Sequence, residues 1–328
     1  MLDIAVLGAG RIGRIHAANI AAHPAARLAG IADLDADAAG RLAASLGTRV
    51  VSVDEAMRSD AVLIASPTPT HAEYVELAAA AGRAVFCEKP IDLSAARVRA
   101  CLAAVRTAGV VLMVGFNRRF DPHFVALKQR LDAGAIGALE LLTIISRDLS
   151  PPPPAYVATS GGLFRDMMIH DLDMARFLLG EEPVEVSAMA SCLVDPAIGA
   201  AGDVDTALVT LRTASGRLCQ ISNSRRATYG YDQRIEAHGA AGLLRAGNVV
   251  PTTVELATGS GFLSDPVQPF FLERYAQAYR AELAAFIEAV LGKGPVRPDG
   301  EDGLRALLLA DAALEAANTG RTIRLEAP

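Results

Sequence analysis

A glycine-rich turn directly behind an apolar strand near the start of the chain constrains the fold more than any other feature. The run Ile4–Leu7 leads into Gly8-Ala9-Gly10-Arg11-Ile12-Gly13, and apolar residues at helical spacing follow. In such a turn the first glycine permits a tight bend, the second lets the backbone approach a pyrophosphate, and the third lets the helix pack on the strand. The start of the helix offers unpaired N–H groups to phosphates. This context favours a dinucleotide-binding turn, with the turn of a methyltransferase or a flavoprotein as the alternative.

A carboxylate at the end of the second expected strand indicates which dinucleotide would bind. Asp33 follows the strand Leu28–Ala32 and lies about 20 residues past Gly13, where such folds place the group that accepts hydrogen bonds from the adenosine ribose. A carboxylate there would repel a 2′-phosphate. Asp35 adds a second negative charge, and the first cation downstream is Arg41. The pattern therefore favours NAD over NADP.

The order of the expected elements predicts an α/β protein of two domains. Up to about Asn117 strands alternate with helices, which predicts an N-terminal Rossmann domain with a doubly wound parallel sheet. The expected strands are Ile4–Leu7, Leu28–Ala32, Ala61–Ala65, Ala84–Phe86 and Val110–Val114. The expected helices between them include Ala38–Leu46, His71–Ala80 and Ser94–Ala108. We assign residues 1–120 to this NAD-binding domain.

Residues 121–328 have a different rhythm, with several strands in series. This predicts a C-terminal α+β domain built on a large, mostly antiparallel sheet. The expected strands are Leu139–Ser146, Val184–Ser191, Thr206–Leu211, Arg217–Ser222, Gln233–Ala237 and Leu243–Val254, the last with a Gly-Asn interruption. A hairpin turn is expected at Thr213–Gly216. The expected helices are Pro122–Ala133, Leu163–Leu179, Glu273–Leu291 and Glu301–Thr319. The four prolines Pro151–Pro154 predict a stiff loop.

Composition and charge exclude several kinds of partner. The chain has 328 residues, of which 52% are hydrophobic, so it can bury a large core. A formal net charge of −6 without any basic run argues against nucleic-acid binding. No signal peptide is expected, and apolar runs are shorter than the ~20 residues of a membrane span. The scattered cysteines are expected to be reduced thiols of a cytoplasmic protein and not zinc ligands. They are Cys87, Cys101, Cys192 and Cys219.

Three loops follow parallel strands and should meet at one edge of the first sheet, where ligands of such sheets bind. They are Gly8–Gly13, Ser66–Thr70 and Cys87–Pro90. Thr70 is expected to cap the helix after it, and the loop it closes could equally be a stiff connector. The residues expected to hold the cofactor are Gly8, Gly10, Arg11, Ile12, Gly13, Asp33, Ser66, Pro67, Thr68, His71, Glu88 and Lys89.

Lys89 is the first candidate for chemistry. It ends the strand Ala84–Phe86 within Glu88-Lys89-Pro90, on the cofactor side of the sheet. A compact ammonium there could hold a substrate hydroxyl and stabilise a developing alkoxide. Pro90 would fix the backbone and could adopt the cis isomer. The alternative interpretation is a solvated surface lysine.

The helix Leu163–Leu179 carries the second candidate. Asp166, His170 and Asp173 are spaced at i, i+4 and i+7, so they should share one helix face and be half-buried among apolar neighbours. A carboxylate can orient an imidazole, and the imidazole can take the proton of an alcohol near neutral pH. A structural Asp–His hydrogen bond is the alternative. A metal site is less well supported because the H-E-x-x-H pattern is absent.

Two further polar segments are candidates for substrate contact. Arg118 or Arg119 follows the last parallel strand, where it could bind a polar substrate or hold a domain interface. Tyr229 and Tyr231 open a strand of the second domain, and their hydroxyls could reach a hydroxylated substrate. Aromatic core packing is the alternative for both tyrosines.

Taken together, these motifs resemble the glucose–fructose oxidoreductase/inositol dehydrogenase (Gfo/Idh/MocA) family. The resemblance rests on the glycine turn, on Glu88-Lys89-Pro90 and on Gly161-Gly162 followed by Asp166 and His170, and it runs over nearly the whole chain. The segments Asp166–Arg176 and Tyr229–Arg234 resemble in particular the bacterial members that oxidise myo-inositol. The run Pro151–Pro154 departs from the family pattern, which leaves the geometry of a substrate loop open.

The resemblance implies a role for each candidate residue. Lys89 contacts the hydroxyl being oxidised, His170 is the general base and Asp166 is its partner. Arg119, Asp173 and Tyr231 contact the substrate together with these three. Gly8, Gly10, Gly13 and Asp33 hold NAD, and no metal is implied.

The resemblance also implies an activity and an assembly. We expect NAD-dependent oxidation of a secondary alcohol on a polyol ring, with myo-inositol as the leading substrate. A sugar or another inositol isomer is the alternative substrate, and a non-catalytic NAD-binding sensor is the alternative of another class. Family members commonly form tetramers that pair through the open face of the second sheet. A homo-oligomer is therefore expected, with residues 121–328 as an open-faced domain for substrate binding and oligomerisation.

Overall fold

A computed structural model describes residues 1–326. The chain divides into two compact units. The first comprises Met1–Phe120 together with Ala278–Leu307, and the second comprises Asp121–Gln277 and the chain from Leu308 onward. The assignment of residues 1–120 and 121–328 to two functional domains remains a prediction.

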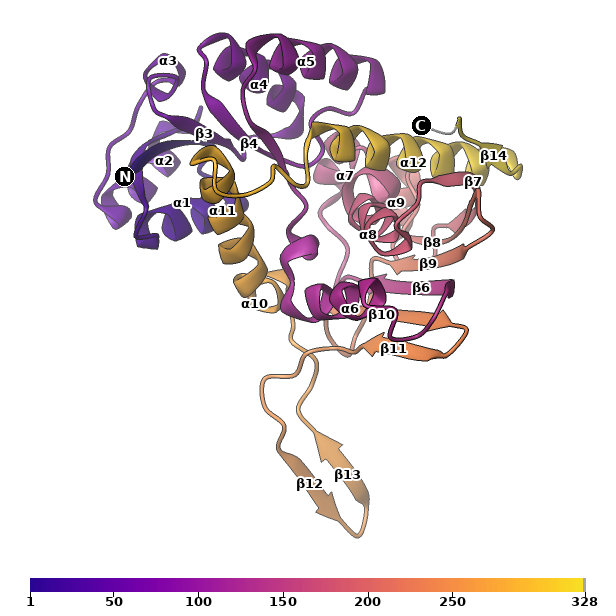
Figure 1. The fold of residues 1–328 in the computed structure, drawn as a ribbon. Coiled ribbons are helices and arrows are strands. Elements are labelled where there is room, and N and C mark those ends of the chain that lie inside the picture. Colours follow the sequence, from indigo (N-terminus) through magenta and orange to yellow (C-terminus); the bar gives the residue numbers. More distant parts are fainter. Residues whose placement is uncertain (327–328) are drawn as a thin grey trace. The chain divides into compact units, whose positions relative to one another are not determined.

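The first unit is a five-stranded, fully parallel sheet in the order β2-β1-β3-β4-β5. Its strands are β1 (Leu2–Leu7), β2 (Ala26–Ala32), β3 (Ala61–Ile64), β4 (Ala84–Glu88) and β5 (Leu112–Gly115). All four residues of β3 and of β5 are buried, as expected for parallel strands with helices on both faces. The predicted doubly wound Rossmann sheet is confirmed (Figure 1).

The helices of this unit connect the strands in the usual alternation. They are α1 (Arg11–Ala22), α2 (Ala36–Leu46), α3 (Val53–Ala56), α4 (His71–Ala80) and α5 (Ala95–Ala108), with short 3₁₀ turns η1 (Thr68–Thr70) and η2 (Asn117–Phe120). Most of α11 (Ala276–Val290) and the first part of α12 (Gly300–Thr319) also belong to it. The strand order changes direction between β1 and β3. The loops at that point are therefore the expected place for a ligand.

The second unit is built on a seven-stranded sheet in the order β11-β10-β6-β9-β8-β7-β14. The strands are β6 (Leu139–Arg147), β7 (Pro183–Ser191), β8 (Thr206–Thr213), β9 (Leu218–Ser224), β10 (Asp232–Gly239), β11 (Gly242–Ala246) and β14 (Ile323–Arg324). Only β6 and β9 pair in parallel, which confirms the mostly antiparallel sheet. The predicted turn at Thr213–Gly216 joins β8 to β9, with Gly216 donating to the carbonyl of Thr213.

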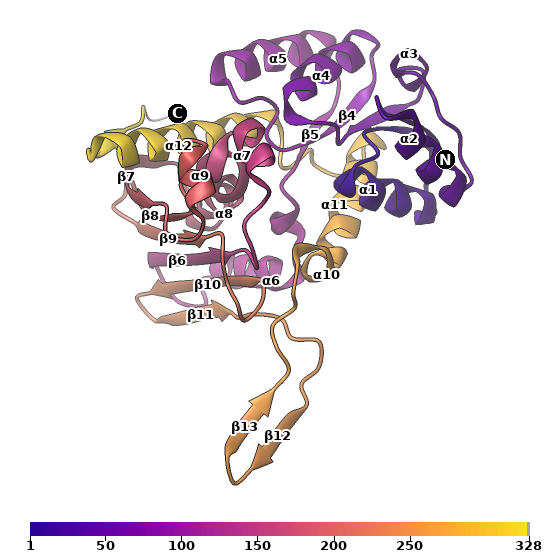
Figure 2. The ribbon, with the colours of Figure 1, turned by 180° about the vertical axis from the view of Figure 1, so that it is seen from behind.

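Helices cover one face of this sheet. The helices of this unit include α6 (Pro122–Asp132), α7 (Pro154–Ser160), the π-helical turn η3 (Leu163–Met168), α8 (Ile169–Leu179), α9 (Pro196–Ala200) and α10 (Phe271–Arg274). Of these, α8 packs on β6 and α6 on β11. Both views show α8 on one side of the strands (Figures 1 and 2). Burial alternates along β8, where Ala207 and Val209 are buried and Leu208 and Thr210 are exposed. The other face is therefore open, as predicted.

Four expected elements differ from the structure. The helix Leu163–Leu179 is π-helical over its first six residues, and the helix Glu273–Leu291 is interrupted at Tyr275. The loop Pro151–Pro154 leads straight into helix α7, because proline is tolerated in the first turn of a helix. The strand Leu243–Val254 ends early, at Ala246.

Asn248 explains the early end of β11. Its side-chain oxygen accepts the backbone N–H of Gln233 at 2.7 Å, so a side chain takes the place of the next strand partner. The chain then forms a separate hairpin of β12 (Glu255–Thr258) and β13 (Gly261–Ser264), which the sequence analysis did not predict. Among the helices of residues 1–326, none is both long and apolar enough to cross a bilayer.

Candidate active site

The glycine turn has the geometry that its sequence predicts. Gly8 has a φ of +112°, and a Cβ added to Gly13 would lie 1.9 Å from the carbonyl oxygen of Gly8. Only glycine permits this approach of α1 to the end of β1. A Cβ at Gly10 would instead meet nothing within 4 Å. Gly10 thus faces open space, as a residue must where a ligand approaches the backbone.

The start of α1 provides a place for phosphates. Gly10 is the N-cap of this 12-residue helix, and no side chain caps it. The positive end of the helix dipole therefore has no side-chain cap and favours an anion there. Arg11 is exposed and Ile12 is half-buried at this end.

Asp33 braces the same turn. One carboxylate oxygen accepts the backbone N–H of Ala9 at 2.5 Å, and the other accepts that of Asp35 at 2.8 Å. Each oxygen keeps a further lone pair for a ribose hydroxyl. The contact with Ala9 was not predicted, because it joins residues 24 positions apart. Asp33 thus fixes the turn, and its contact with an adenosine ribose remains a prediction.

His71 ties two of the cofactor-side loops together. Its ring nitrogens lie 2.7 Å from the carbonyl oxygen of Ser66 and 2.8 Å from that of Pro90, and the side chain is buried. Thr70 is the N-cap residue of α4, as the sequence predicts, but its side chain does not cap the helix. It bonds to the Pro67 carbonyl and to the Ser66 hydroxyl, which closes the loop on itself. The structure gives His71 a bracing role, and its contact with a cofactor remains a prediction, as do those of Ser66, Pro67 and Thr68.

Lys89 follows β4 directly, at the carboxyl end of the first sheet. The strand ends at Glu88, Lys89 is half-buried, and the Lys89–Pro90 bond is cis. Lys89 and the glycine turn therefore lie at the same edge of one sheet. This is the placement that the sequence predicts for a cation beside the dinucleotide.

A buried cluster of titratable side chains lies behind Glu88. The Nε2 atom of His16 lies 2.8 Å from a Glu88 oxygen and 4.0 Å from an oxygen of Glu282. His16 and Glu282 are fully buried, and the rings of Phe86 and Tyr279 pack edge-on against His16. No sequence pattern predicts this cluster, because its residues come from three elements that are distant in the chain, α1, β4 and α11.

Glu282 is the unusual member of this cluster. Neither of its carboxyl oxygens has a hydrogen-bond partner among the described residues. Burial, and then the charge of Glu88, raises its pKa well above the ordinary value. The three side chains have donor atoms within 4.8 Å of one another, close enough to hold a cation. The side chains of His16 and Glu88 are already joined by a hydrogen bond, which needs no cation.

Arg119 has a partner within the first unit. Its guanidinium donates to Asp302 at 3.0 Å, and both side chains are about one-tenth exposed. Arg118 is buried. The structure thus shows a structural contact for Arg119, and its substrate contact remains a prediction.

In the second unit, Asp166 has two neighbours that the sequence analysis missed. It lies in the π-helical turn η3, where it accepts the hydroxyl of Tyr156 at 3.0 Å. The guanidinium of the buried residue Arg225 is 3.6 Å from its other oxygen. The i, i+4, i+7 face expected of a regular α-helix does not hold here, because a π turn is wider than an α turn.

The remaining acidic residues of helix α8 are buried. Asp171 accepts the side-chain amide of Asn223 at 2.9 Å, and Asp173 lies 3.6 Å from the guanidinium of Arg176. We had expected Asp173 to be half-buried, and it is fully buried, whereas His170 is half-buried. The structure thus gives Asp173 a structural partner. Its contact with substrate, and the pairing of Asp166 with His170, remain predictions.

The tyrosines of the second candidate segment are anchored differently. The Tyr229 hydroxyl donates to Asp232 at 2.6 Å, whereas the ring of Tyr231 packs edge-on against Tyr275. Burial raises the pKa of Asp232, but hydrogen bonds from Arg234, Tyr229 and then Asn248 outweigh it and lower that pKa below the ordinary value. Asp232 therefore stays ionised and fixes this segment. Tyr231 is almost fully buried, and its contact with substrate remains a prediction.

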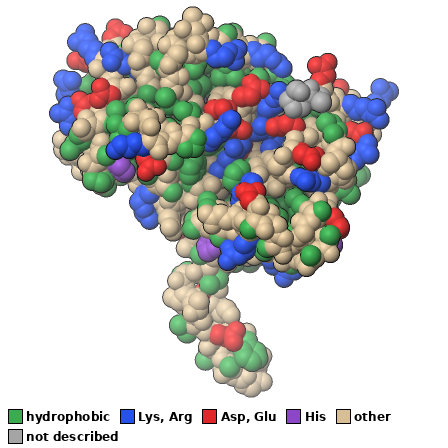
Figure 3. All heavy atoms as spheres, in the orientation of Figure 1, with side chains coloured by type: hydrophobic (Ala, Val, Ile, Leu, Met, Phe, Trp, Pro, Cys, Tyr) green, Lys and Arg blue, Asp and Glu red, His purple; other side chains and the backbone are tan. Residues whose placement is uncertain are grey.

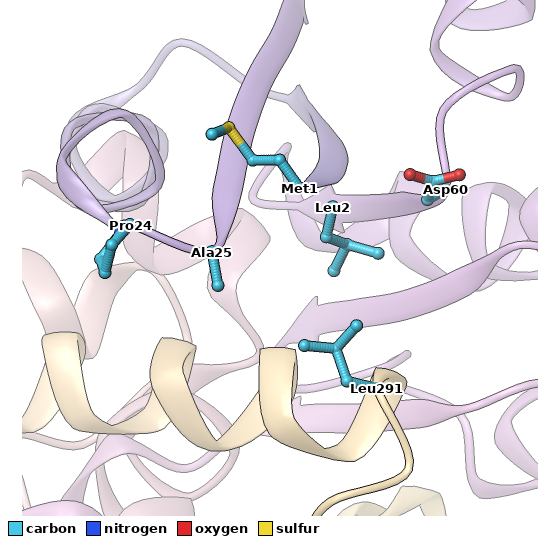
Figure 4. A pocket seen from close by; sticks show the side chains of 6 residues that line it. All are labelled: Met1, Leu2, Pro24, Ala25, Asp60 and Leu291. Carbon is cyan, nitrogen blue, oxygen red and sulfur yellow. The ribbon is translucent and has the colours of Figure 1, made fainter.

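A pocket elsewhere in the first unit does not belong to this site. Its lining residues lie at the amino-terminal start of β1 and around it, at the end of the strand opposite to the glycine turn (Figure 4). They are Met1, Leu2, Pro24, Ala25, Asp60 and Leu291. Ligands of parallel sheets bind at the carboxyl ends of the strands, so this pocket lies at the wrong edge.

The fold and the glycine turn define a dinucleotide-binding oxidoreductase. Residues 2–116 match the family model of the oxidoreductase family with an NAD-binding Rossmann fold, and residues 124–245 match that of the Gfo/Idh/MocA C-terminal domain. The cofactor of this domain is NAD. The chain belongs to the Gfo/Idh/MocA oxidoreductase family.

Similar proteins of known name cover the whole chain. An inositol 2-dehydrogenase of Rhizobium meliloti is 53% identical over 98% of both chains. The crystal structure of a myo-inositol dehydrogenase from Corynebacterium glutamicum superposes with a TM-score of 0.95 at 48% identity, covering 100% of both chains. A scyllo-inositol dehydrogenase of Lactobacillus casei with bound NAD(H) and scyllo-inositol superposes with a TM-score of 0.90 at 30% identity, covering 99% of both.

Replacing Asp33 with Ala should weaken NAD binding and relax cofactor choice. The change removes the brace on Ala9 and the acceptor for the ribose hydroxyls, at about 0.5–1.5 kcal/mol for each hydrogen bond. We expect the Kd for NAD to rise about 10-fold and the Kd for NADP to fall relative to it. Calorimetric titration of both cofactors measures the change. The exposed residue Asp37 provides the control Asp37→Ala, which should leave both values unchanged, and an equal loss for both cofactors in Asp33→Ala would contradict the ribose role.

Replacing Glu282 with Gln should stabilise the protein increasingly as the pH rises. Because the pKa of Glu282 is raised in the folded chain, the folded state keeps a proton that the unfolded chain releases above about pH 4.5. The wild type therefore loses stability from there upward, whereas a glutamine has no proton to lose. We expect the difference in Tm between variant and wild type to grow between about pH 5 and about pH 8, by about 2–4 °C for each kcal/mol.

The matched control for this experiment is Glu288→Gln, which removes an exposed carboxylate from the same helix. Its Tm should follow that of the wild type at every pH. A constant difference between Glu282→Gln and the wild type would show that Glu282 ionises in the folded protein as freely as in the unfolded chain.

Proposed function

We propose that this protein is an NAD-dependent inositol 2-dehydrogenase that oxidises myo-inositol to 2-keto-myo-inositol. The observation that carries the proposal is full-length similarity to proteins of that name, with 53% identity to the relative from Rhizobium meliloti. The retained residues Lys89, Asp166 and His170 support a catalytic protein over a sensor. The braced glycine turn supports NAD as the acceptor.

In this reaction NAD, when bound, accepts a hydride from the carbon that carries the hydroxyl. The protein supplies placement and a path for the proton. Gly10 and the uncapped start of α1 would hold the pyrophosphate, and Asp33 the adenosine ribose. These groups fit the cofactor because Gly10 leaves open space and no side chain caps the start of α1, which is where phosphates bind in such folds.

The proton of the hydroxyl passes to a side chain. His170 takes it as the hydride leaves the same carbon, so the products are a ketone, NADH and an imidazolium. Asp166 supports the positive charge on that imidazole. Lys89 steadies the oxygen through the transition state, in which it gains negative charge. Arg119, Asp173 and Tyr231 would select the shape of the ring through its other hydroxyls.

A substrate panel tests this function. We expect NADH formation with myo-inositol at a higher kcat/KM than with scyllo-inositol, glucose or xylose, and little turnover with NADP. The matched loss variant is His170→Asn, which should lower kcat about 10²-fold or more by removing the base. Tight NAD binding without turnover on any polyol would favour the sensor, and a higher kcat/KM for an aldose would favour a sugar dehydrogenase.

We also infer a cytoplasmic homo-oligomer, a tetramer or a dimer. Free cysteines support a reducing compartment. The open face of the second sheet carries exposed apolar side chains, and the register places four of them in two neighbouring pairs, Met189 with Leu208 and Leu141 with Leu218. Such a face is self-complementary in a two-fold dimer. The β12–β13 hairpin adds exposed apolar side chains, such as Phe262. Apolar side chains are seen in green on this projecting segment in Figure 3.

Charge on this face should break the assembly. We expect the double variant Met189→Glu and Leu208→Glu to lower the molecular mass in solution, because each carboxylate would be buried without a partner. Light scattering behind size exclusion measures the mass. Leu77→Glu, on an exposed helix position of the first unit, is the control and should keep the wild-type mass. A wild type that is already monomeric would refute the proposed oligomer.

A further inference from the structure

Arg225 is a buried cation that none of the roles above uses. It follows β9 and is 1% exposed, and its Nε and Nη2 atoms have no hydrogen-bond partner among the described residues. A guanidinium removed from water in this way is costly unless charges compensate it. Two carboxylates do so, since Nη2 lies 3.6 Å from Asp166 and 3.9 Å from Asp203.

The two carboxylates belong to different parts of the chain, and both lie at the π-helical turn η3. Asp203 accepts the backbone N–H of Leu163, the first residue of η3, with both oxygens at 3.0 and 3.1 Å. This contact requires Gly162, because a Cβ there would lie 2.6 Å from an oxygen of Asp203. Asp166 lies further along the same π-helical turn. Asp203 thus fixes the start of the turn, and Arg225 lies between that anchor and Asp166.

The position of Arg225 is itself fixed. Its backbone N–H donates to the carbonyl of Asp205 at 2.8 Å, and the Asp205 carboxylate accepts three successive backbone N–H groups at residues 193–195. Burial raises the pKa of Asp205, but those backbone hydrogen bonds outweigh it and lower that pKa. The loop that carries the guanidinium is therefore anchored independently of Asp166.

We propose that Arg225 is a positioning residue for the oxidation, acting through Asp166. The buried guanidinium holds that carboxylate in place at the oxygen that does not accept the Tyr156 hydroxyl, so that the carboxylate can support the imidazolium of His170. Two other charged side chains near this turn have partners of their own. Asp203 accepts the first N–H of η3, and Arg165 pairs with Asp311 at 2.7 Å. The inference rests on the proposed function, in which His170 is the base.

A double-mutant cycle tests the proposal. The variants are Arg225→Met, Asp166→Asn and their combination, with kcat for myo-inositol, KM for NAD and the free energy of unfolding as readouts. We expect Arg225→Met to lower kcat about 10²-fold by misplacing Asp166, while KM for NAD changes less than about 2-fold. In the Asp166→Asn background the same change should lower kcat less than about 3-fold, because the group through which it acts is gone.

Two further variants keep the test decisive. Arg225→Lys retains the charge and should recover part of kcat, and it replaces Arg225→Met in the cycle if the latter does not fold. Arg226→Met removes the neighbouring exposed arginine and should leave kcat unchanged. Losses in kcat that multiply independently, or an unchanged kcat in Arg225→Met, would overturn the proposal.

The same cycle separates this inference from the proposed function. Coupling in the free energy of unfolding without coupling in kcat would show that Arg225 is only structural and would also overturn the proposal. A wild type without turnover on any polyol would instead remove the proposed function. In that case the unfolding cycle would still report whether Arg225 holds Asp166, and the absence of coupling there would refute the contact itself.

Discussion

The contact between Gly13 and the Gly8 carbonyl sets the geometry of the cofactor end of the first unit. A Cβ at Gly13 would lie 1.9 Å from that oxygen, and one at Gly8 would lie 2.4 Å from the carbonyl of Ala65, just after β3. Strand β1, helix α1 and the loop after β3 therefore meet at distances that only glycine allows. This fixes where the uncapped start of α1 points, and Asp33 locks the turn by accepting the N–H of Ala9.

Both units then face the same physical problem, a buried ionisable group, and they solve it differently. In the first unit Glu282 has no hydrogen-bond partner among the described residues, so burial shifts its balance toward the neutral acid. In the second unit Arg225 cannot lose its charge, so two carboxylates must face it. Glu282 thus avoids a buried charge by keeping a proton, whereas the buried charge of Arg225 is balanced by carboxylates. The Arg225 cluster is therefore the more sensitive to the loss of a partner.

The sequence predicts those features that depend on local pattern. Apolar β-branched runs, glycine spacing and Ala-rich helical spacing were enough for the parallel sheet, the glycine turn and the bounds of α4. The open face of the second sheet was expected only from the family resemblance. Interactions between distant residues were not predictable. Arg225 lies 59 positions from Asp166, and Glu282 lies far from His16 in the chain, so no spacing rule joins them. A lone arginine or glutamate carries no local sign of burial.

The π-helical turn η3 shows why residue spacing alone did not predict which side chains share a helix face. The spacing of Asp166, His170 and Asp173 suggested one face of an α-helix, but the first of them lies in the wider turn and the last is fully buried. π turns are rare and are found frequently at functional sites. Here an external anchor holds the turn, since Asp203 binds its first N–H and Gly162 has no Cβ to meet that carboxylate. Gly161 and Gly162 both have positive φ. The pair Gly161-Gly162, which the sequence offered only as a family motif, thus has a physical cause. It lets the chain enter a turn that presents Asp166 to Arg225.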